Sequence, residues 1–532
     1  MQKEYVAMSI DFEKFKNPKE YLKDGKEVTI FGPPGTGKTT TLIKLVEGSL
    51  AHYVDPKKIG FMSFSRKAAT EAKTRALKNI EGLDSRDLIY FRTLHSLAFS
   101  WLGLSTSEVM SGRDYNELGK LVGLDFRTTQ TVNIEEGPLF NVGAGGDKYM
   151  SLIQYARVKQ VDLQEEFHKG WDHSLNWQQL SVLDKAFKDY KKRQGKYDFI
   201  DMIEKFIWKG TSPEFDLLII DEAQDLAPLQ WKMVKDVLVP NSQRVYYAGD
   251  DDQAIYSWMG VDVDNFLNAS ETKYILSKSY RVPEHPFAFA KGLTDQITKR
   301  ENKSWNPTKE KGFVTWHNDI LDVDMTEGEW LILTRTNYIA NKVCNKLREE
   351  GYVFWREGEG WSVSVNVLVA IEVWLKLQRG ATVPADLLKP FSKLINPKYI
   401  QKSGRKIMYS LSDDEEWNLI DLKRICGFEA NNFVTWQNVL KISEQVAAYI
   451  ISVRKRGEKI LSADPRIRVS TIHRAKGGEA DNVALLLDST KACIESEDQD
   501  AEKRVWYVGV TRAKKELHIV VGSGQHQFGD LR

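Results

Sequence analysis

The sequence predicts an α/β fold with two lobes, each built on parallel strands and each interrupted by a mostly helical insertion. Short apolar runs typical of buried strands alternate with segments of helical periodicity, which is the pattern of a parallel sheet covered by helices on both faces. The alternation stops twice, over residues 101–196 and 365–450, where helical patterns predominate. A chain of 532 residues has room for about three or four domains, so two lobes with two insertions fit its length.

The strand-like runs assign the remaining segments to the lobes. In the first lobe they are 28–31, 59–65, 88–91, 215–220 and 245–248. In the second lobe they are 313–316, 330–334, 352–355, 467–471, 483–487 and 517–521. We therefore expect the first lobe at 1–100 and 197–272, its helical insertion at 101–196, the second lobe at 273–364 and 451–532, and its shorter helical insertion at 365–450.

Composition excludes several classes of protein. Charged residues make up 28% of the chain and hydrophobic residues 42%, as in ordinary globular proteins, and the net charge of +1 does not by itself indicate a polyanionic partner. The first residues carry charges throughout, and no run approaches the roughly 20 apolar residues of a membrane span. Cys344, Cys426 and Cys493 lie too far apart in sequence to suggest a disulfide framework or a metal cluster. We expect a cytoplasmic protein with no membrane partner.

The clearest motif is GPPGTGKTT at residues 32–40, which matches the phosphate-binding pattern G-x-x-x-x-G-K-[ST]. An apolar run precedes it and a helical pattern follows it, which is the order that such a loop requires. The glycines let backbone N–H groups point at phosphates beside a helix N-terminus. Lys38 is then placed to reach the β- and γ-phosphates, and Thr39 to hold Mg²⁺. The predicted nucleotide-binding residues of the loop are Gly32, Pro33, Pro34, Gly35, Thr36, Gly37, Lys38, Thr39 and Thr40.

Two further strand ends carry the polar residues that phosphate chemistry needs. Asp221 ends the apolar run 215–220 and can hold Mg²⁺, and Glu222 is then placed to orient or deprotonate the attacking water. Gln253, after the next run, suits a sensor of the γ-phosphate. An acidic helix N-cap is the ordinary explanation of a lone Asp-Glu pair. The intact phosphate-binding loop favours the catalytic interpretation.

Cations for the developing negative charge are expected from the second lobe. Arg281 lies in SYR and Arg512 in YVGVTRA. Arginines supplied to a phosphoryl-transfer site increase the rate by ~10³–10⁵ in related systems. For either arginine alone, a surface ion pair would be the ordinary explanation.

The motifs, taken in order, resemble the UvrD/Rep/PcrA branch of superfamily 1 helicases. The matching segments are GPPGTGKTT (32–40), MSFSRKAATEAKTR (62–75), TLHSLAF (93–99), YDFIDMI (197–203), LLIIDEAQDL (217–226), AGDDDQAIYSWMG (248–260), SYRVP (279–283), LTRTN (333–337), STIHRAKGGEADNVAL (470–485) and YVGVTRAKKEL (507–517). The resemblance implies two RecA-like P-loop motor lobes and a DNA helicase that uses ATP and Mg²⁺. It also implies movement in the 3′ to 5′ direction on single-stranded DNA.

The resemblance also implies roles for individual residues. Tyr280 would stack on the base of ATP, Glu479 would lie near the ribose, and Arg281 and Arg512 would be arginine fingers. The DNA contacts of the first lobe would be Phe64, Thr93, His95, Tyr256 and Trp258. The positions lining the nucleotide or DNA side of the second lobe would be Arg335, Asn337, Thr471, His473 and Lys476.

For the aromatic residues of this set, stacking on bases at ~1–3 kcal/mol each is the functional interpretation. Packing in the core is the ordinary alternative, and for Phe64 the sequence supports core packing and base stacking equally. The polar, glycine-flanked loop around Trp258 favours exposure of that ring.

Three functional hypotheses follow. The first is a helicase that acts on single-stranded DNA and on junctions of single and double strands, as a monomer or weak oligomer, with accessory replication or repair proteins as partners. The second is a translocase that strips proteins from DNA or needs a partner to open duplex, because the second insertion is short and lacks the Gly-Ile-Gly-like hairpin that relatives use on duplex DNA. The third is a binding scaffold without activity, which the complete set of catalytic residues disfavours.

Overall fold

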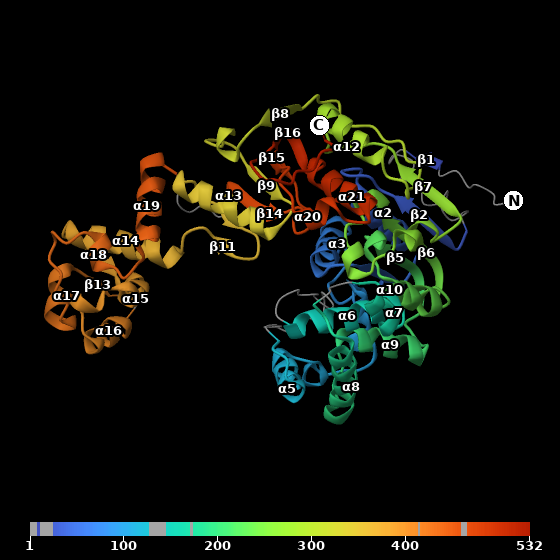
Figure 1. The fold of residues 1–532 in the computed structure, drawn as a ribbon, viewed down its shortest axis with the longest axis horizontal. Coiled ribbons are helices and arrows are strands. Elements are labelled where there is room, and N and C mark those ends of the chain that lie inside the picture. Colours follow the sequence, from blue (N-terminus) through green and yellow to red (C-terminus); the bar gives the residue numbers. More distant parts are fainter. Residues whose placement is uncertain are drawn as a thin grey trace. The chain divides into compact units, whose positions relative to one another are not determined.

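In the computed structural model the chain forms two compact units, Met1–Gly312 with Ser496–Thr511 and Phe313–Glu495 with Arg512–Arg532. The structure describes residues 8–10, 25–126, 145–170, 174–412, 415–458 and 465–531. Each unit contains one seven-stranded sheet and one mostly helical insertion (Figure 1). The predicted fold class is confirmed.

The sheet of the first unit has the strand order β1-β7-β2-β6-β5-β3-β4, and all of its strands run parallel. Its strands are β1 (Met8–Ile10), β2 (Glu27–Phe31), β3 (Ile59–Ser63), β4 (Phe91–Thr93), β5 (Phe215–Asp221), β6 (Ser242–Gly249) and β7 (Thr272–Leu276). The central strands are buried along almost their whole length, as the near-continuous apolar runs of the sequence predict for a sheet covered on both faces.

Alternate residues of these strands enter two different cores. On one face, Ile30 and Ile219 pack against the apolar side of α2. On the other face, Phe31 and Ile220 pack with α9 and α10. The helices of this lobe are α2 (Lys38–Ala51), α3 (Arg66–Asn79), α4 (Leu94–Trp101), α9 (Phe199–Lys209), α10 (Pro228–Met233), α11 (Val263–Leu267), α12 (Glu284–Thr294) and α21 (Gln499–Val510), with short helical turns η2 (Pro56–Lys58), η3 (Thr106–Glu108), η4 (Ala223–Asp225), η5 (Val234–Leu238), η6 (Asp251–Gln253) and η7 (Ser257–Met259). The parallel strands thus direct their carboxyl ends to one edge, where the loops of the candidate site follow.

The insertion of the first unit has its own core, which includes Leu118, Leu152 and Phe187. Its helices are α5 (Gly112–Val122), α6 (Gly145–Lys159), α7 (Leu163–His168) and α8 (Trp177–Gln194). This arrangement agrees with the helical character predicted for residues 101–196.

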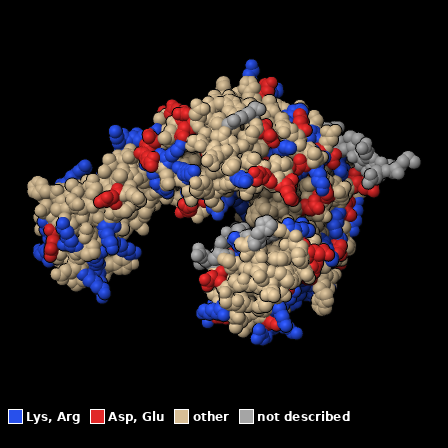
Figure 2. All heavy atoms as spheres, viewed as in Figure 1, with Lys and Arg blue, Asp and Glu red and all other residues tan. Residues whose placement is uncertain are grey.

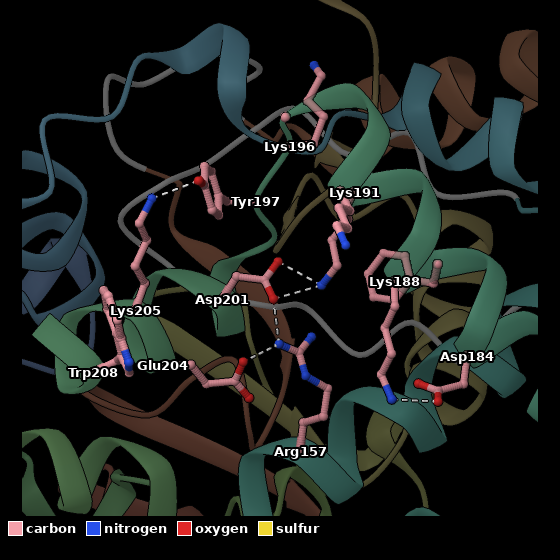
Figure 3. A pocket seen from close by; sticks show the side chains of 13 residues that line it. Arg157, Asp184, Lys188, Lys191, Lys196, Tyr197, Asp201, Glu204, Lys205 and Trp208 are labelled. Carbon is pink, nitrogen blue, oxygen red and sulfur yellow. Dashed lines mark hydrogen bonds and ion pairs between the residues drawn. The ribbon is translucent and has the colours of Figure 1, made fainter.

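A buried ionic cluster ties α6 and α8 of this insertion to α9 of the lobe (Figure 3). The Arg157 guanidinium lies 2.7 Å from carboxylates of Asp198, Asp201 and Glu204, and Lys191 Nζ lies 2.6 Å from Asp198. Burial alone would raise the pKa of Asp198, but the two cations hold it below its usual value. The cluster lies beside a surface cavity of about 790 Å³. It fixes the insertion to the segment that follows it, because buried charges are stable only when they are paired.

The sheet of the second unit has the order β11-β10-β14-β9-β15-β16-β8. Its strands are β8 (Phe313–His317), β9 (Trp330–Thr334), β10 (Trp355–Arg356), β11 (Gly360–Trp361), β14 (Ile467–Thr471), β15 (Ala480–Leu486) and β16 (Ala513–Val520). The hairpin partner β11 is antiparallel to β10, and the other strands of this sheet are parallel. The sheet is accompanied by α13 (Asn337–Glu349), α20 (Lys491–Ile494) and the turn η8 (Ile320–Asp322).

The insertion of the second unit is also a separate helical body. It contains α14 (Val365–Gln378), α15 (Ala385–Leu394), η9 (Pro397–Tyr399), α16 (Lys402–Tyr409), α17 (Leu419–Cys426), α18 (Trp436–Val439), α19 (Glu444–Arg456) and the strand pair β12 (Val383–Pro384) and β13 (Glu416–Trp417). Trp374 lies at its centre, where its indole N–H donates to the carbonyl of Val434 at 2.9 Å. Basic and acidic side chains both occur on the face of the molecule shown in Figure 2, as the small net charge implies.

The boundary between the two units differs from the one predicted at residues 272 and 273. Strand β7 spans that position and pairs in parallel with β2, with Tyr274 opposite Ile30, so the chain stays in the first unit as far as residue 312. Helix α21 also packs in the first unit, against α12 and η6. The runs 88–91 and 352–355 form strands only at their ends. Among the described residues, no helix is long and apolar enough to cross a membrane.

Candidate functional site

The phosphate-binding loop joins β2 to α2 at the carboxyl edge of the first sheet. Gly35 and Gly37 have φ values of +71° and +78°, a backbone region that L side chains rarely adopt. The Gly32 N–H donates to the carbonyl of Gly249 at 2.7 Å, which fixes the loop to the end of β6. The Thr36 hydroxyl closes the turn by donating to the Pro33 carbonyl at 2.7 Å. The result is a helix N-terminus with the geometry of an anion site.

Three charged side chains meet beside this loop. Lys38 Nζ lies 2.9 Å from Glu222 Oε1. Burial disfavours the Lys38 ammonium, but Glu222 and Asp221 outweigh burial and raise the pKa of Lys38 above its ordinary value. Burial and the neighbouring Glu222 raise the pKa of Asp221 to about 7. A cation bound beside Asp221 would lower this pKa again, because a nearby positive charge stabilises the ionised carboxylate.

Glu222 has an unusual backbone conformation. Its φ is +52°, one of three positive values among the described non-glycine residues, and such strain gathers at functional sites. Its backbone N–H donates to Asp221 Oδ1 at 3.0 Å. Its carboxylate accepts from the Gln224 side chain at 2.6 Å, and Gln224 in turn accepts from the Asp250 N–H at 3.1 Å. The general-base candidate is therefore oriented from two sides.

Gln253 lies at the end of η6, directly after β6. Its side-chain amide donates to Asp250 Oδ2 at 2.7 Å, and both residues are buried. This bond sets the direction of the Gln253 amide. The sequence placed Gln253 at this edge, but it gave no sign of the partner that orients it.

The SYR segment packs directly on the phosphate-binding loop. The Ser279 hydroxyl donates to the Pro34 carbonyl at 2.8 Å, and the Tyr280 N–H donates to the Gly35 carbonyl at 2.8 Å. A Cβ added at Gly35 would lie 2.3 Å from the Cβ of Arg281, so only glycine fits there. Tyr280 remains 53% exposed beside the loop.

This placement corrects the prediction that Arg281 belongs to the second lobe. The pairing of β7 with β2 carries the segment into the first unit. Arg281 therefore lies in the same compact unit as Lys38.

The predicted DNA contacts of the first unit include a row of three aromatic rings. Phe64 and Tyr256 are stacked with centroids 5.4 Å apart, and Tyr256 meets Trp258 edge-on at 6.4 Å. Trp258 is 46% exposed, whereas Phe64 is partly buried and packs against the core. A small apolar hollow lined by Phe64, His95 and Met259 lies next to the row. The structure thus brings the predicted aromatic residues together.

The two polar members of this set are less accessible. Thr93 is buried, and its hydroxyl caps α4 by accepting from the Ser96 N–H at 3.2 Å. His95 is 7% exposed, and its ring meets Phe199 edge-on at 6.0 Å. Burial lowers the pKa of His95 to about 4, so the ring is neutral at physiological pH. Whatever these residues contribute, His95 does not contribute charge.

In the second unit, the predicted residues gather where β9 and β14 end. Thr334 and Thr471 are opposite each other in these paired strands. The segments after them carry Arg335, His473 and Lys476 in turns and Asn337 as the first residue of α13. The Asn337 side-chain carbonyl accepts from Arg356 at 3.0 Å. Arg512 and Glu479 also lie close together, because Arg512 donates to the carbonyl of Gly478 at 3.3 Å and Ala480 N–H donates to that of Arg512 at 3.2 Å.

Comparison with known proteins identifies the family. The model of the UvrD/REP helicase N-terminal domain matches residues 15–274, and that of the UvrD-like helicase C-terminal domain matches residues 427–524, together about two thirds of the chain. The chain belongs to the UvrD-like helicase family. The family and the enzyme class predicted from the sequence, an ATP-dependent DNA helicase, are confirmed.

Individual relatives agree with this assignment. The chain is 23% identical to "Probable DNA helicase II homolog" of Mycoplasma pneumoniae, over 97% of this chain and 85% of that protein. It is 24% identical to "ATP-dependent DNA helicase PcrA" of Bacillus subtilis, over 93% of this chain and 80% of that protein. It is 24% identical to "ATP-dependent DNA helicase Rep" of Buchnera aphidicola, over 69% of this chain and 56% of that protein.

Proposed function

We propose that this helicase moves 3′ to 5′ on single-stranded DNA, hydrolyses ATP with Mg²⁺, and opens duplex at junctions of single and double strands. The observation that carries the proposal is the convergence of Lys38, Glu222 and the SYR segment on one phosphate-binding loop. The aromatic row, in which Trp258 is exposed, lies in the same compact unit. The direction of movement is supported by the resemblance of the motifs to helicases with that polarity.

The residues of the loop fit a magnesium nucleotide. Thr39 and Asp221 offer a hydroxyl and a carboxylate, the hard oxygen ligands that Mg²⁺ prefers. When bound, Mg²⁺ neutralises phosphate charge. The raised pKa of Asp221 supports this assignment, since a buried carboxylate without a full counter-charge gains most from a cation.

The chain's own groups supply the remaining steps. The loop N–H groups and the Lys38 ammonium bind the phosphates, while the exposed Tyr280 ring offers a surface for the nucleobase. Glu222, oriented by Gln224, accepts the proton of the attacking water. Arg281, seated on the loop, stabilises the charge that develops on the transferred phosphoryl group, and the resemblance of the motifs assigns the same role to Arg512.

A short segment supports coupling between hydrolysis and movement on DNA. Gln253 ends η6, and Tyr256 follows three residues later at the start of η7, where the aromatic row begins. A change in the side-chain position of Gln253 is therefore passed along a few backbone bonds to the DNA-stacking rings. Asp250 anchors one end of this segment by its bond to Gln253.

A second candidate function is a single-strand translocase that needs a partner to open duplex. The short second insertion of about 90 residues favours it, because its sequence lacks the Gly-Ile-Gly-like hairpin motif that relatives use on duplex DNA. An accessory protein of replication or repair would then complete the activity.

Strand displacement from partial duplexes with either a 3′ or a 5′ single-stranded tail separates the two functions. Displacement from the 3′ tail alone, absent in Lys38→Ala, is the expected result. Displacement from the 5′ tail would contradict the polarity. ATP hydrolysis stimulated by single strands without displacement would establish the translocase instead.

A further inference from the structure

A lysine is completely buried among three consecutive aspartates behind the nucleotide site. The side chains of Lys303, Asp250, Asp251 and Asp252 are all 0% exposed. Lys303 Nζ lies 2.7 Å from Asp250 Oδ1 and 2.9 Å from Asp252 Oδ2, and it also pairs with Asp251. Within the described part of the chain, these three carboxylates form the one acidic group close enough to hold a metal ion. The Lys303 ammonium takes the place of that cation.

The aspartates have further partners besides Lys303. Arg300 forms a two-pronged ion pair with Asp252, with Nε and Nη2 at 2.9 and 2.8 Å from its oxygens. Asp251 accepts from the Glu301 N–H at 2.8 Å. Lys303 and Arg300 thus pair with the three buried carboxylates, and the buried Arg504 adds a third positive charge beside them by donating to the Asp251 carbonyl at 2.9 Å. Among the cations of the described residues, Lys303 alone pairs with all three carboxylates.

One of these carboxylates links Lys303 to the nucleotide site. Asp250 Oδ1 accepts from Lys303 Nζ, and Asp250 Oδ2 accepts from the Gln253 amide at 2.7 Å. The Asp252 N–H also donates to Asp250 Oδ1, at 3.3 Å, so a backbone group and the ammonium together set the rotation of the carboxylate that orients Gln253. Without Lys303, Asp250 would keep the weaker bond from the Asp252 N–H but lose the cation with which it is paired.

We propose that Lys303 is a positioning residue for ATP hydrolysis, which acts through Asp250 to hold the Gln253 side chain toward the nucleotide. The inference rests on the sensor role proposed for Gln253. Within the described part of the chain, Lys303 forms no ion pair or hydrogen bond with the phosphate-binding loop or with the aromatic row. Its removal is therefore expected to lower kcat and to leave the binding of ATP and of single-stranded DNA largely intact.

The test uses the full chain and compares Lys303→Met with Lys273→Met. Lys273 is a matched control, because it is also largely buried, pairs at 2.7 Å with Glu301, and lies 5.8 Å from the same Phe31 ring as Lys303. It has no bond to Asp250. We expect kcat for single-strand-stimulated ATP hydrolysis to fall at least tenfold in Lys303→Met, with the KM for ATP changed less than threefold, and both to stay near normal in Lys273→Met.

A double-mutant comparison separates positioning from a general loss of structure. In a Gln253→Ala background, Lys303→Met should lower kcat less than twofold further, because the side chain that it positions is already absent. An equal loss in both backgrounds would overturn the inference, as would a normal kcat in Lys303→Met when Gln253→Ala lowers it. A normal kcat in Gln253→Ala alone would remove the sensor role first, and the inference with it.

The buried charge of the cluster could prevent Lys303→Met from folding. The charge-matched variant Lys303→Met with Asp251→Asn then replaces it, since one positive and one negative charge are removed together. Asp250 remains without its ammonium in this variant, so the same fall in kcat is expected. A normal kcat in the folded charge-matched variant would overturn the inference.

Discussion

Replacing Trp258 by alanine tests whether the aromatic row binds DNA. Trp258 is the most exposed of the three rings, and it touches its neighbour Tyr256 edge-on rather than face-on. A base stacked on an aromatic side chain contributes ~1–3 kcal/mol. Because 46% of Trp258 is exposed, we expect about half of the upper value, roughly 1.5 kcal/mol, which is about a tenfold rise in the Kd for single-stranded DNA.

The assay is a fluorescence anisotropy titration of a labelled oligothymidine in the absence of nucleotide. Trp208→Ala is the matched control, because that tryptophan is 86% exposed, lies in α9 outside the aromatic row, and should leave the Kd unchanged. The slope of log Kd against log salt should be the same in all three proteins, since neither change removes a phosphate contact. An unchanged Kd in Trp258→Ala, or an equal loss in both variants, would refute the stacking role.

Three other predictions follow from the site. Lys38→Ala should abolish ATP hydrolysis while the Kd for single-stranded DNA stays within about twofold, because the change removes the cation beside Glu222 and Asp221 and no residue of the aromatic row; near-normal turnover would contradict the loop assignment. Gly35→Ala should weaken ATP binding by isothermal titration at least tenfold, because its Cβ would clash with Arg281 at a φ of +71°. Burial lowers the pKa of His95 from 6.5 to about 4, so the unfolded chain takes up the proton first and stability falls as the pH drops from 6.5 toward 4. Between pH 7 and 5, the free energy of unfolding measured with denaturant should fall by about 2 kcal/mol less in His95→Gln than in the unmodified protein. An equal fall in the two proteins would place His95 in solvent.

The sequence was most informative where strands are buried on both faces. Strands β9 and β14 were predicted with their observed bounds, because a central parallel strand appears as an uninterrupted apolar run. The order of strand, loop and helix around GPPGTGKTT was also predicted, and the structure has it as β2, residues 32–37 and α2. The turn of this loop requires positive φ values at Gly35 and Gly37, which favour glycine, so the requirement is visible in the local sequence.

What the sequence could not give is the pairing of distant segments. The pattern of residues 272–276 permits a strand but does not say which sheet it joins, and the pairing of Tyr274 with Ile30 decides that Arg281 lies in the first unit. Lys303 is the sharper case. Nothing in the local sequence around it predicts a buried side chain, because its burial depends on Asp250 and its neighbours some 50 residues earlier.

The run from Gly249 to Trp258 joins the two halves of the candidate site within ten residues. Its first residue accepts the hydrogen bond that anchors the phosphate-binding loop, its middle carries the oriented Gln253, and its end carries the aromatic row. A Cβ at Gly249 would lie 2.2 Å from Gln224 Oε1, so this start is tightly packed, whereas Trp258 at the other end is exposed. Under the proposed function, this run couples the nucleotide site to the DNA-stacking rings, and the coupling acts in both directions.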